Sequence, residues 1–260
     1  MHYAYGDESI DEKFVSYGVI AIDFDKINIA ENIIIDAKTS LGAPAESRLH
    51  CRELFAGDAR RKTSFSHLTT DDVFGMYEGI FRKLSSIGCR NISAVAKTSE
   101  FPKILPGGKM ETVNDGIERP DVYTKSVNVT GKQIAVYCAW ASMIPLSKNP
   151  GFSQVTFIPD IDNSSIEWFH GKTEQTNPLN NFYIENSTTK QPEKLNTLVI
   201  KDNKPPLLEL ADCIAYTSRR VMNNSMIGIG KKFMALYNAI SPEEVLSGIG
   251  QDGRVRFKFE

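Results

Sequence analysis

Two short runs of apolar and aromatic residues open the chain, and a charged stretch separates them. The runs cover residues 3–8 and 13–22. This pattern predicts two antiparallel strands joined by a tight turn. Val15 and Ile20 lie on opposite faces of the second run, and both are apolar. We therefore expect this second strand to be covered on both of its sides.

Apolar residues at helical or alternating spacing continue through much of the chain. Helical spacing predicts helices over about residues 26–41, 69–88, 132–146, 207–222 and 231–240. Strands are expected over residues 48–54, 91–97, 154–158, 195–200 and 254–259. This alternation of strands and helices is typical of a mixed α/β domain.

Two long segments lack this regular spacing. Residues 98–132 hold three Pro and four Gly, and residues 161–194 are rich in Asn, Thr and Gln. Both are much longer than the roughly 4 to 6 residues of an ordinary connection. We interpret the chain as a single domain over residues 1–260 with insertions at about 98–132 and 161–194, although its length of 260 residues would also suit two small domains.

Composition narrows the class of protein. The chain is 41% hydrophobic and 24% charged, which is the composition of a globular domain. Its net charge of -2 provides no overall attraction to nucleic acid or to an anionic membrane, so any contact with a polyanion must come from local patches. No apolar stretch reaches the roughly 18 residues of a membrane span, and the N-terminus does not resemble a secretory signal. A cytoplasmic protein without membrane contact is expected.

The four cysteines are widely spaced and form no C-x-x-C pair, so the sequence does not favour a zinc knuckle or a thioredoxin-type redox motif. We expect reduced and mostly buried thiols at Cys51, Cys89, Cys138 and Cys213.

Asp7 is the first candidate for chemistry because it ends the first predicted strand. Alternation places Asp7 on the strand face that carries Tyr3 and Tyr5, and it places Glu8 on the opposite face. Only one of the two carboxylates can then face a given site. The alternative is that these polar residues only begin a turn.

Asp212 interrupts the apolar side of its predicted helix. A carboxylate in that position must lose its charge or find a partner, and no Lys or Arg occurs within one turn of it. Glu209 lies three residues earlier on the same side and should repel it. A divalent cation would remove this conflict. Alternatively, Asp212 is partly exposed, or a hydroxyl or backbone donor satisfies it.

Asp160 and Asp162 follow directly after a predicted strand. In α/β sheets functional side chains gather at the carboxyl ends of strands, although aspartates that form turns are also common there. His50 lies in the predicted strand 48–54 and could transfer protons, while Glu53 could bind a metal or orient a water. His50 could equally be a hydrogen-bonded surface residue.

Three motifs in the same order resemble a large family of bacterial and phage proteins, the domain of unknown function 3800 family. Its opening motif, aspartate-glutamate-serine before a second apolar strand, matches residues 7–9 and 14–22. A histidine followed three residues later by a glutamate matches His50 and Glu53. Its closing motif of leucine, alanine, aspartate and apolar residues matches residues 207–216.

This resemblance implies a ribonuclease-H-like fold, in which helices flank a mixed sheet and the first strand, a later strand and the final core helix supply an acidic site. Asp7, Asp160 and Asp212 fall at those three places. Two Mg²⁺ or Mn²⁺ ions held by such carboxylates could hydrolyse a phosphodiester. We expect Asp7 to contact both ions, Asp160 and Asp212 to complete one each, and Glu53 and Glu209 to be secondary ligands.

The expected substrate is RNA or DNA, bound through local basic residues. The candidates are Arg60, Arg61, Lys62 and Arg219, although each could belong to an ordinary solvated surface. Two other functions stay open. One is a recognition module without catalytic activity, which could act with a partner protein in phage defence or as a homo-oligomer. The other is a phosphatase that uses the same acidic residues.

Overall fold

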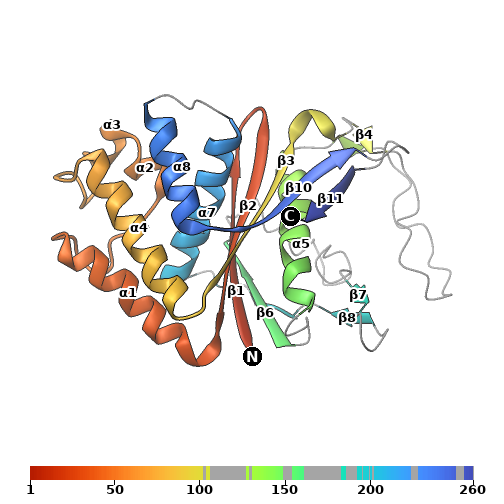
Figure 1. The fold of residues 1–260 in the computed structure, drawn as a ribbon, viewed down its shortest axis with the longest axis horizontal. Helices are drawn as coiled ribbons and strands as arrows, with labels where there is room; N and C mark the ends of the chain where they lie inside the picture. The colour runs from red at the N-terminus through yellow and green to blue at the C-terminus, as the bar shows by residue number, and fades with distance from the viewer. Residues whose placement is uncertain are drawn as a thin grey trace.

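In the computed structural model, the described part of the chain forms one large mixed sheet with helices on both faces (Figure 1). The structure describes residues 1–101, 104–105, 127–128, 131–148, 154–160, 183–185, 192–194, 196–198, 200, 202–223, 228–249 and 255–259. Within them the large sheet has seven strands in the order β11-β10-β3-β2-β1-β6-β9. These are β1 (His2–Ile10), β2 (Phe14–Asp23), β3 (Arg90–Lys97), β6 (Val155–Pro159), β9 (Asn196–Thr197), β10 (Glu243–Ile249) and β11 (Val255–Phe259).

The centre of the sheet is the predicted hairpin of β1 and β2. The two strands pair antiparallel from His2↔Asp23 to Ile10↔Val15. The Asp11 carboxylate closes the turn between them, because it accepts hydrogen bonds from the backbone N–H groups of Lys13 (2.8 Å) and Phe14 (2.9 Å). Strand β3 pairs antiparallel with β2, whereas β6 runs parallel to β1 on the other side.

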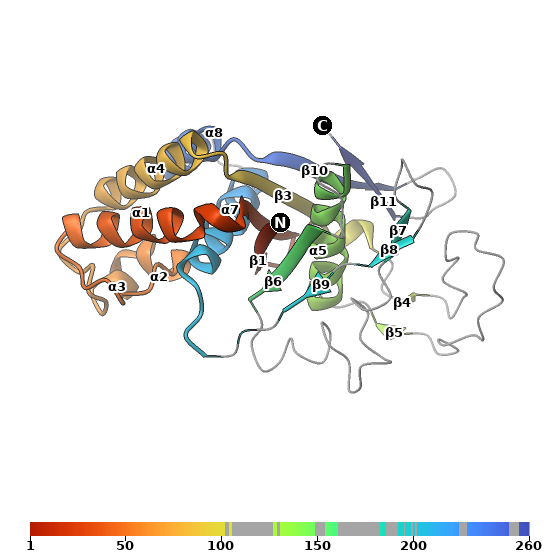
Figure 2. The same ribbon diagram turned by 90° about the horizontal axis from the view of Figure 1, so that it is seen from below.

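Helices cover the two faces of the sheet unequally. Figures 1 and 2 show one group of helices on one face and α5 (Gly131–Lys148) on the other. The larger group consists of α1 (Ile27–Ser40), the short α2 (Cys51–Leu54) and α3 (Gly57–Arg60), α4 (Thr70–Ser86), α7 (Pro206–Met222) and α8 (Ile229–Ile240). Short 3₁₀ turns, η1 (Phe24–Lys26) and η2 (Thr98–Glu100), follow β2 and β3.

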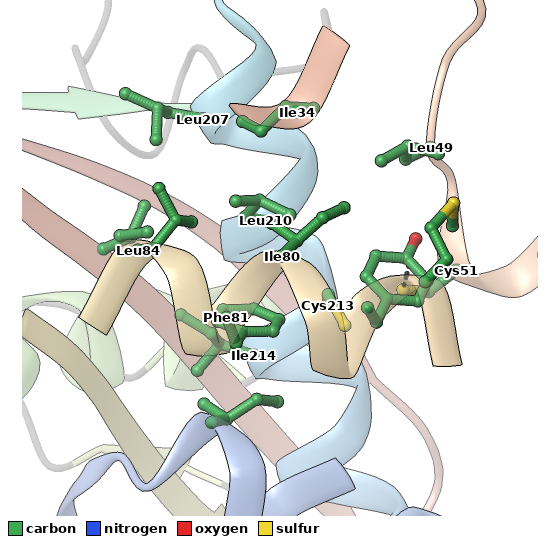
Figure 3. Packing of buried hydrophobic residues seen from close by; sticks show 14 of the residues in the cluster. Ile34, Leu49, Cys51, Ile80, Phe81, Leu84, Leu207, Leu210, Cys213 and Ile214 are labelled. Carbon is green, nitrogen blue, oxygen red and sulfur yellow. Dashed lines mark hydrogen bonds between the residues drawn. The ribbon is translucent and has the colours of Figure 1, made fainter. Parts of the chain in front are cut away.

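Each face of the sheet has its own apolar core. Tyr5, Ile20 and Ile158 belong to the core beneath the larger helical group, while Tyr17 and Phe157 belong to the core beneath α5. Figure 3 shows the first core from close by, with Leu210 and Cys213 of α7, Ile80 and Phe81 of α4, and Cys51 of α2. The expectation that β2 is covered on both sides is confirmed.

Most of the predicted elements are present. The helices expected over residues 26–41, 69–88, 132–146, 207–222 and 231–240 correspond to α1, α4, α5, α7 and α8. Helix α4 begins with a capping box, in which the Thr69 hydroxyl accepts from the Asp72 N–H and the Asp72 carboxylate accepts from the Thr69 N–H. Among the described residues of the strand expected over 195–200, only the two of β9 are extended in the sheet.

The strand predicted over residues 48–54 is wrong. The chain there is a loop followed by the single helical turn α2, in which the His50 carbonyl accepts from the N–H groups of Glu53 (3.0 Å) and Leu54 (2.9 Å). Leu49, Cys51 and Leu54 are all buried, and this spacing suits a loop entering one turn of helix as well as a strand. Seven residues are too few to separate the two by periodicity. Strand β10, parallel to β3, was not predicted at all.

The two expected insertions at about 98–132 and 161–194 fall mostly outside the described residues. The described parts of them include two short pairs of strands, β4 (Ile104–Leu105) with β5 (Val127–Asn128) and β7 (Tyr183–Glu185) with β8 (Pro192–Lys194). All four cysteines are buried and free, as the sequence predicted. Among the described helices, none has the length and hydropathy of a membrane span. The single domain stays a prediction.

Candidate functional site

Asp7 and Asp160 lie side by side at the ends of two neighbouring strands. The parallel register pairs Gly6 of β1 with Pro159 of β6, and the N–H of Asp160 donates to the Gly6 carbonyl at 2.6 Å. Alternation then places both carboxylates on the sheet face of Tyr5 and Ile158, which is the face covered by α7. The predicted position of Asp7 on the face of Tyr5, opposite Glu8, agrees with this register.

Gly18 lets α7 approach this face closely. Asp7 pairs with Gly18 across the hairpin, and a Cβ atom on Gly18 would lie only 2.4 Å from the carbonyl oxygen of Ala211 and 2.5 Å from the nitrogen of Ala215. The Ser16 hydroxyl also donates to the Ala215 carbonyl at 2.6 Å. These contacts fix α7 on β2, so Asp212, the residue after Ala211, comes near Asp7 although 205 positions separate them in the sequence.

The charges of these carboxylates act on one another. Burial raises the pKa of Asp7 well above its usual range, and the negative charges of Asp212, Glu8 and Asp160 raise this pKa further. A hydrogen bond from the Glu8 N–H to Asp7 Oδ1, 2.8 Å long, opposes the shift. The Asp7 carboxylate is therefore a site at which an additional positive charge would be stabilised.

Asp212 is 8% exposed and is bound from the side of α2. Its Oδ2 accepts a hydrogen bond from the Cys51 N–H at 2.8 Å, which is the kind of backbone donor that the sequence left open as an alternative. Burial and the charge of Asp160 raise the pKa of Asp212, and this rise is opposed by the Cys51 N–H and by the positive charges of Arg48 and of a protonated His50. The other carboxylate oxygen, Oδ1, could bind a cation.

Two basic side chains hold Asp160, which is also 8% exposed. Arg48 Nη2 lies 3.4 Å from Asp160 Oδ2, and the Lys204 ammonium group forms an ion pair with Oδ1. Arg48 lies in the loop before α2, and Lys204 lies just before α7. Both loops therefore contribute cations to the acidic site.

His50 and Glu53 lie on the solvent side of the same region. His50 Nδ1 is 3.5 Å from Glu53 Oε1, and their side chains are 36% and 50% exposed. The structure thus keeps His50 near Asp212 but directs Glu53 towards His50 and solvent, because α2 is one helical turn rather than the expected strand.

Glu209, the other expected secondary ligand, has a partner of its own. Its Oε2 lies 2.7 Å from the ammonium nitrogen of Lys38 on α1, and both side chains are nearly buried. Burial raises the pKa of Glu209, while the charge of Lys38 opposes that shift. The repulsion expected between Glu209 and Asp212 is thereby offset at Glu209.

The four expected nucleic-acid contacts fall into two pairs. Arg60 is buried and donates to the Leu54 carbonyl, and Arg219 forms an ion pair with Asp11 and donates to the Ser9 hydroxyl at 2.9 Å. Both of these arginines therefore stabilise the fold. Arg61 and Lys62 are exposed just after α3, and although Arg61 pairs with the exposed Asp58, both side chains are open to a polyanion.

Three contributors to the site were not recognised from the sequence. Lys204 lies in the segment before the helix predicted over residues 207–222, Gly18 lies within the predicted strand 13–22, and the Cys51 N–H is a backbone group, so none of them has a local signal of its role. The same holds for Arg48, two residues before His50, which contacts Asp160. Asp162 lies outside the described residues.

The carboxylates of this site have the chemistry that a hard divalent cation prefers, but they do not form a complete set of ligands. Within the described ranges, no group of three or more His, Cys, Asp or Glu side chains is arranged to hold a metal ion. Asp7 and Asp212 offer hard carboxylate oxygens in a setting where their charges conflict, which suits Mg²⁺ or Mn²⁺. Asp160 could join them only if Arg48 and Lys204 moved away from it.

No protein-family model, curated protein or solved structure matches this chain. The resemblance to the bacterial and phage family thus rests on the sequence motifs alone and stays a prediction.

Proposed function

We propose that the protein is a metal-dependent nuclease. Its active site would consist of Asp7, Asp160 and Asp212 and would hydrolyse phosphodiester bonds. One observation carries the proposal: the ends of β1 and β6 and the helix α7 bring three carboxylates to the same covered side of the sheet, where the charges of Asp160 and Asp212 raise the pKa of Asp7. The same three kinds of element supply the acidic site in the ribonuclease-H-like fold that the motifs imply.

The proposed chemistry assigns a role to each side chain. Asp7 and Asp212 would hold one cation, and Asp160 would be available to a second one if its basic partners Arg48 and Lys204 turned to the substrate. A bound Mg²⁺ or Mn²⁺ would supply an activated water and stabilise the leaving oxygen. The His50 side chain is 36% exposed and lies close to Asp212. In this proposal it stands between the carboxylates and the solvent and accepts a proton during the reaction.

Cation binding and nucleic-acid cleavage test this proposal together. We expect wild type to bind Mn²⁺ in calorimetry and to cleave single- or double-stranded RNA or DNA with Mg²⁺. Asp7→Asn should lose at least about tenfold in Mn²⁺ affinity, since even outer partners of metal ligands contribute that much. Asp36→Asn is the matched control, because Asp36 is an exposed carboxylate on α1 and is not one of the site residues. Equal binding and cleavage by wild type and Asp7→Asn would reject the proposal.

A second function is favoured by the cations on Asp160. Arg48 and Lys204 already neutralise this carboxylate, as they would in a recognition module that has no need of a metal. Such a module would bind nucleic acid or a defence partner with the same affinity whether or not a chelator is present. Calorimetry of wild type with Mn²⁺ separates the two functions, because the module predicts no heat of binding.

A further inference from the structure

Two loops that are far apart in the sequence bring one cation each to the same carboxylate. Arg48 contacts Asp160 Oδ2 and Lys204 contacts Oδ1, so each carboxylate oxygen has its own basic partner. Asp160 is almost buried, whereas the side chains of Arg48 and Lys204 are 58% and 31% exposed. Both cations therefore reach inward to Asp160 while keeping part of their surface open to solvent.

The arginines that stabilise this fold have a different environment. Arg60 and Arg219 are largely buried, and each guanidinium makes contacts with two groups of the protein. Arg48 instead contacts Asp160 through Nη2 at 3.4 Å, which is long for a charged hydrogen bond. A guanidinium has five N–H donors in a planar fork that matches a phosphate. The exposure of Arg48 leaves room for such a ligand.

The balance of charge depends on whether a cation is bound. The site holds the carboxylates of Asp7, Asp160 and Asp212 and, on their solvent side, the cations of Arg48 and Lys204. Without metal, the negative charge retains Arg48 and Lys204 on Asp160. A divalent cation at Asp7 would compete with them for the carboxylates and make the site attractive to an anion. Metal and anion should then each raise the affinity of the other.

We propose that Arg48 and Lys204 bind the backbone phosphate of a nucleic acid, and that Asp160 holds them in place until the nucleic acid arrives. The inference rests on the proposed function in that both use the same site, and it adds the residues that position the substrate.

A polymer suits this part of the surface better than a small phosphate ester. Arg48 is open to solvent, and exposed Arg52, Arg61 and Lys62 follow it on α2 and at the end of α3, two helices in contact with each other. Successive cations along a surface can contact successive phosphates of one strand. A small ester would be contacted by Arg48 and Lys204 alone.

Variants of the two cations test the inference in the full-length protein. Binding of labelled single-stranded DNA and RNA is measured by fluorescence anisotropy, once with Ca²⁺ and once with chelator, and Mn²⁺ binding is measured by calorimetry. The variants are Arg48→Gln, Lys204→Gln and the charge-conserving Lys204→Arg. Lys83→Gln is the control, because Lys83 is exposed on α4 outside the site. Circular dichroism confirms that each variant is folded.

Arg48→Gln and Lys204→Gln should each weaken oligonucleotide binding about tenfold, the usual effect of losing one hydrogen bond to a charged group. The salt dependence should become less steep by about one phosphate contact. Lys204→Arg should retain the affinity of wild type, and Lys83→Gln should not change it. Mn²⁺ affinity should stay the same or increase in Lys204→Gln, because one competitor for Asp160 is gone.

The outcomes separate this inference from the proposed function. Unchanged oligonucleotide affinity in both glutamine variants would overturn the inference, even if Mn²⁺ binds and the nuclease proposal survives. Failure of wild type to bind Mn²⁺ would overturn the nuclease proposal, yet a tenfold loss of oligonucleotide affinity with chelator would still support phosphate binding. Calorimetry with inorganic phosphate completes the comparison: if the variants weaken phosphate binding but not oligonucleotide binding, the assignment to a nucleic-acid backbone is wrong.

Discussion

Helix α7 carries two buried carboxylates only three positions apart, and the protein surrounds them very differently. Glu209 has a dedicated cation, because Lys38 reaches it from α1 and the pair is shielded from solvent. Asp212 lies near Asp7 and Asp160 instead, and the cations of that region, Arg48 and Lys204, come from loops and remain partly exposed.

This difference separates a structural pair from a candidate site. We call the Lys38–Glu209 pair closed, because removing either charge would leave the other one unpaired in an environment of low polarity. Around Asp7 the negatively charged carboxylates repel one another, which raises the pKa of Asp7. Such repulsion is typical of functional sites, whereas a purely structural arrangement would avoid it. The comparison predicts opposite responses when one charge is removed from each region.

The largest effect is expected at the closed pair. Lys38→Met removes the ammonium group that lies 2.7 Å from Glu209 Oε2, and it leaves this largely buried carboxylate with only the Leu49 N–H and the charge of Arg48 among the interactions described. Breaking a buried pair on one side costs about 3–5 kcal/mol of unfolding free energy. Urea denaturation at neutral pH measures the loss. The double variant Lys38→Met/Glu209→Leu should regain most of it, and a single variant as stable as wild type would show that the pair is not closed.

A smaller loss is expected where α7 rests on the sheet. Gly18→Ala places a Cβ against the backbone of α7, and overpacking of this kind costs about 1–3 kcal/mol. Because α7 must shift, Asp212 moves relative to Asp7, so Mn²⁺ affinity should fall as well. Gly75→Ala on α4 is the control, since an added Cβ there meets nothing within 4 Å. That variant should be stabilised by about 0.5–1 kcal/mol. Thermal unfolding and calorimetry compare the two.

Removing the charge of Asp7 should increase the stability of the protein. Because the pKa of Asp7 is raised in the folded protein, the folded state binds a proton that the unfolded state has already released. The stability from this proton is complete below the ordinary carboxyl pKa and is lost as the pH rises through the raised pKa. Asp7→Asn should therefore stabilise the metal-free protein at neutral pH by on the order of 1 kcal/mol, a common gain at a functional site. Urea denaturation from acidic to neutral pH, with chelator present, should show a flatter profile in the variant. A destabilised variant would mean that Asp7 is a structural residue.

The smallest effect is expected for an ion pair that belongs to neither region. Arg82 and Glu78 lie four residues apart on α4 with Arg82 exposed, 3.2 Å from nitrogen to oxygen. Arg82→Gln should cost only about 0.3–0.5 kcal/mol. Urea denaturation at low and high salt should show that this small difference disappears as salt screens it, whereas the cost of Lys38→Met persists.

Local patterns were sufficient for most of the fold. Helix α4 could be placed from its capping residues and its apolar stripe, and the β1–β2 hairpin from two apolar runs around a charged turn. Strand β10 was not predicted, because Glu243, Glu244 and the Ser and Gly that follow leave little alternation of apolar and polar residues. Val245 of this strand is nevertheless fully buried. The stretch at residues 48–54 was assigned to the wrong element because its buried residues fit two spacings.

The candidate site was predictable only in part. Asp7, Asp160 and Asp212 each carried a local signal, namely a strand end or an interruption of an apolar stripe. The partners of these residues carried none. Arg60 and Arg219 looked like surface cations, yet one donates to the carbonyl of Leu54 and the other pairs with Asp11. The neighbouring residues in the sequence do not show whether a charged side chain faces solvent or a partner inside the protein.

The sequence by itself therefore determined which residues are acidic, which faces are apolar and where most helices and strands begin, because these properties depend on neighbours a few positions away. Only the tertiary structure decided which carboxylate receives which cation. Lys38 lies 171 positions from Glu209, and Lys204 lies 44 positions from Asp160, so the first pairing requires α1 to pack beside α7 and the second requires the start of α7 to meet the end of β6. Electrostatic energies depend on distance in space, and the folded sheet sets those distances.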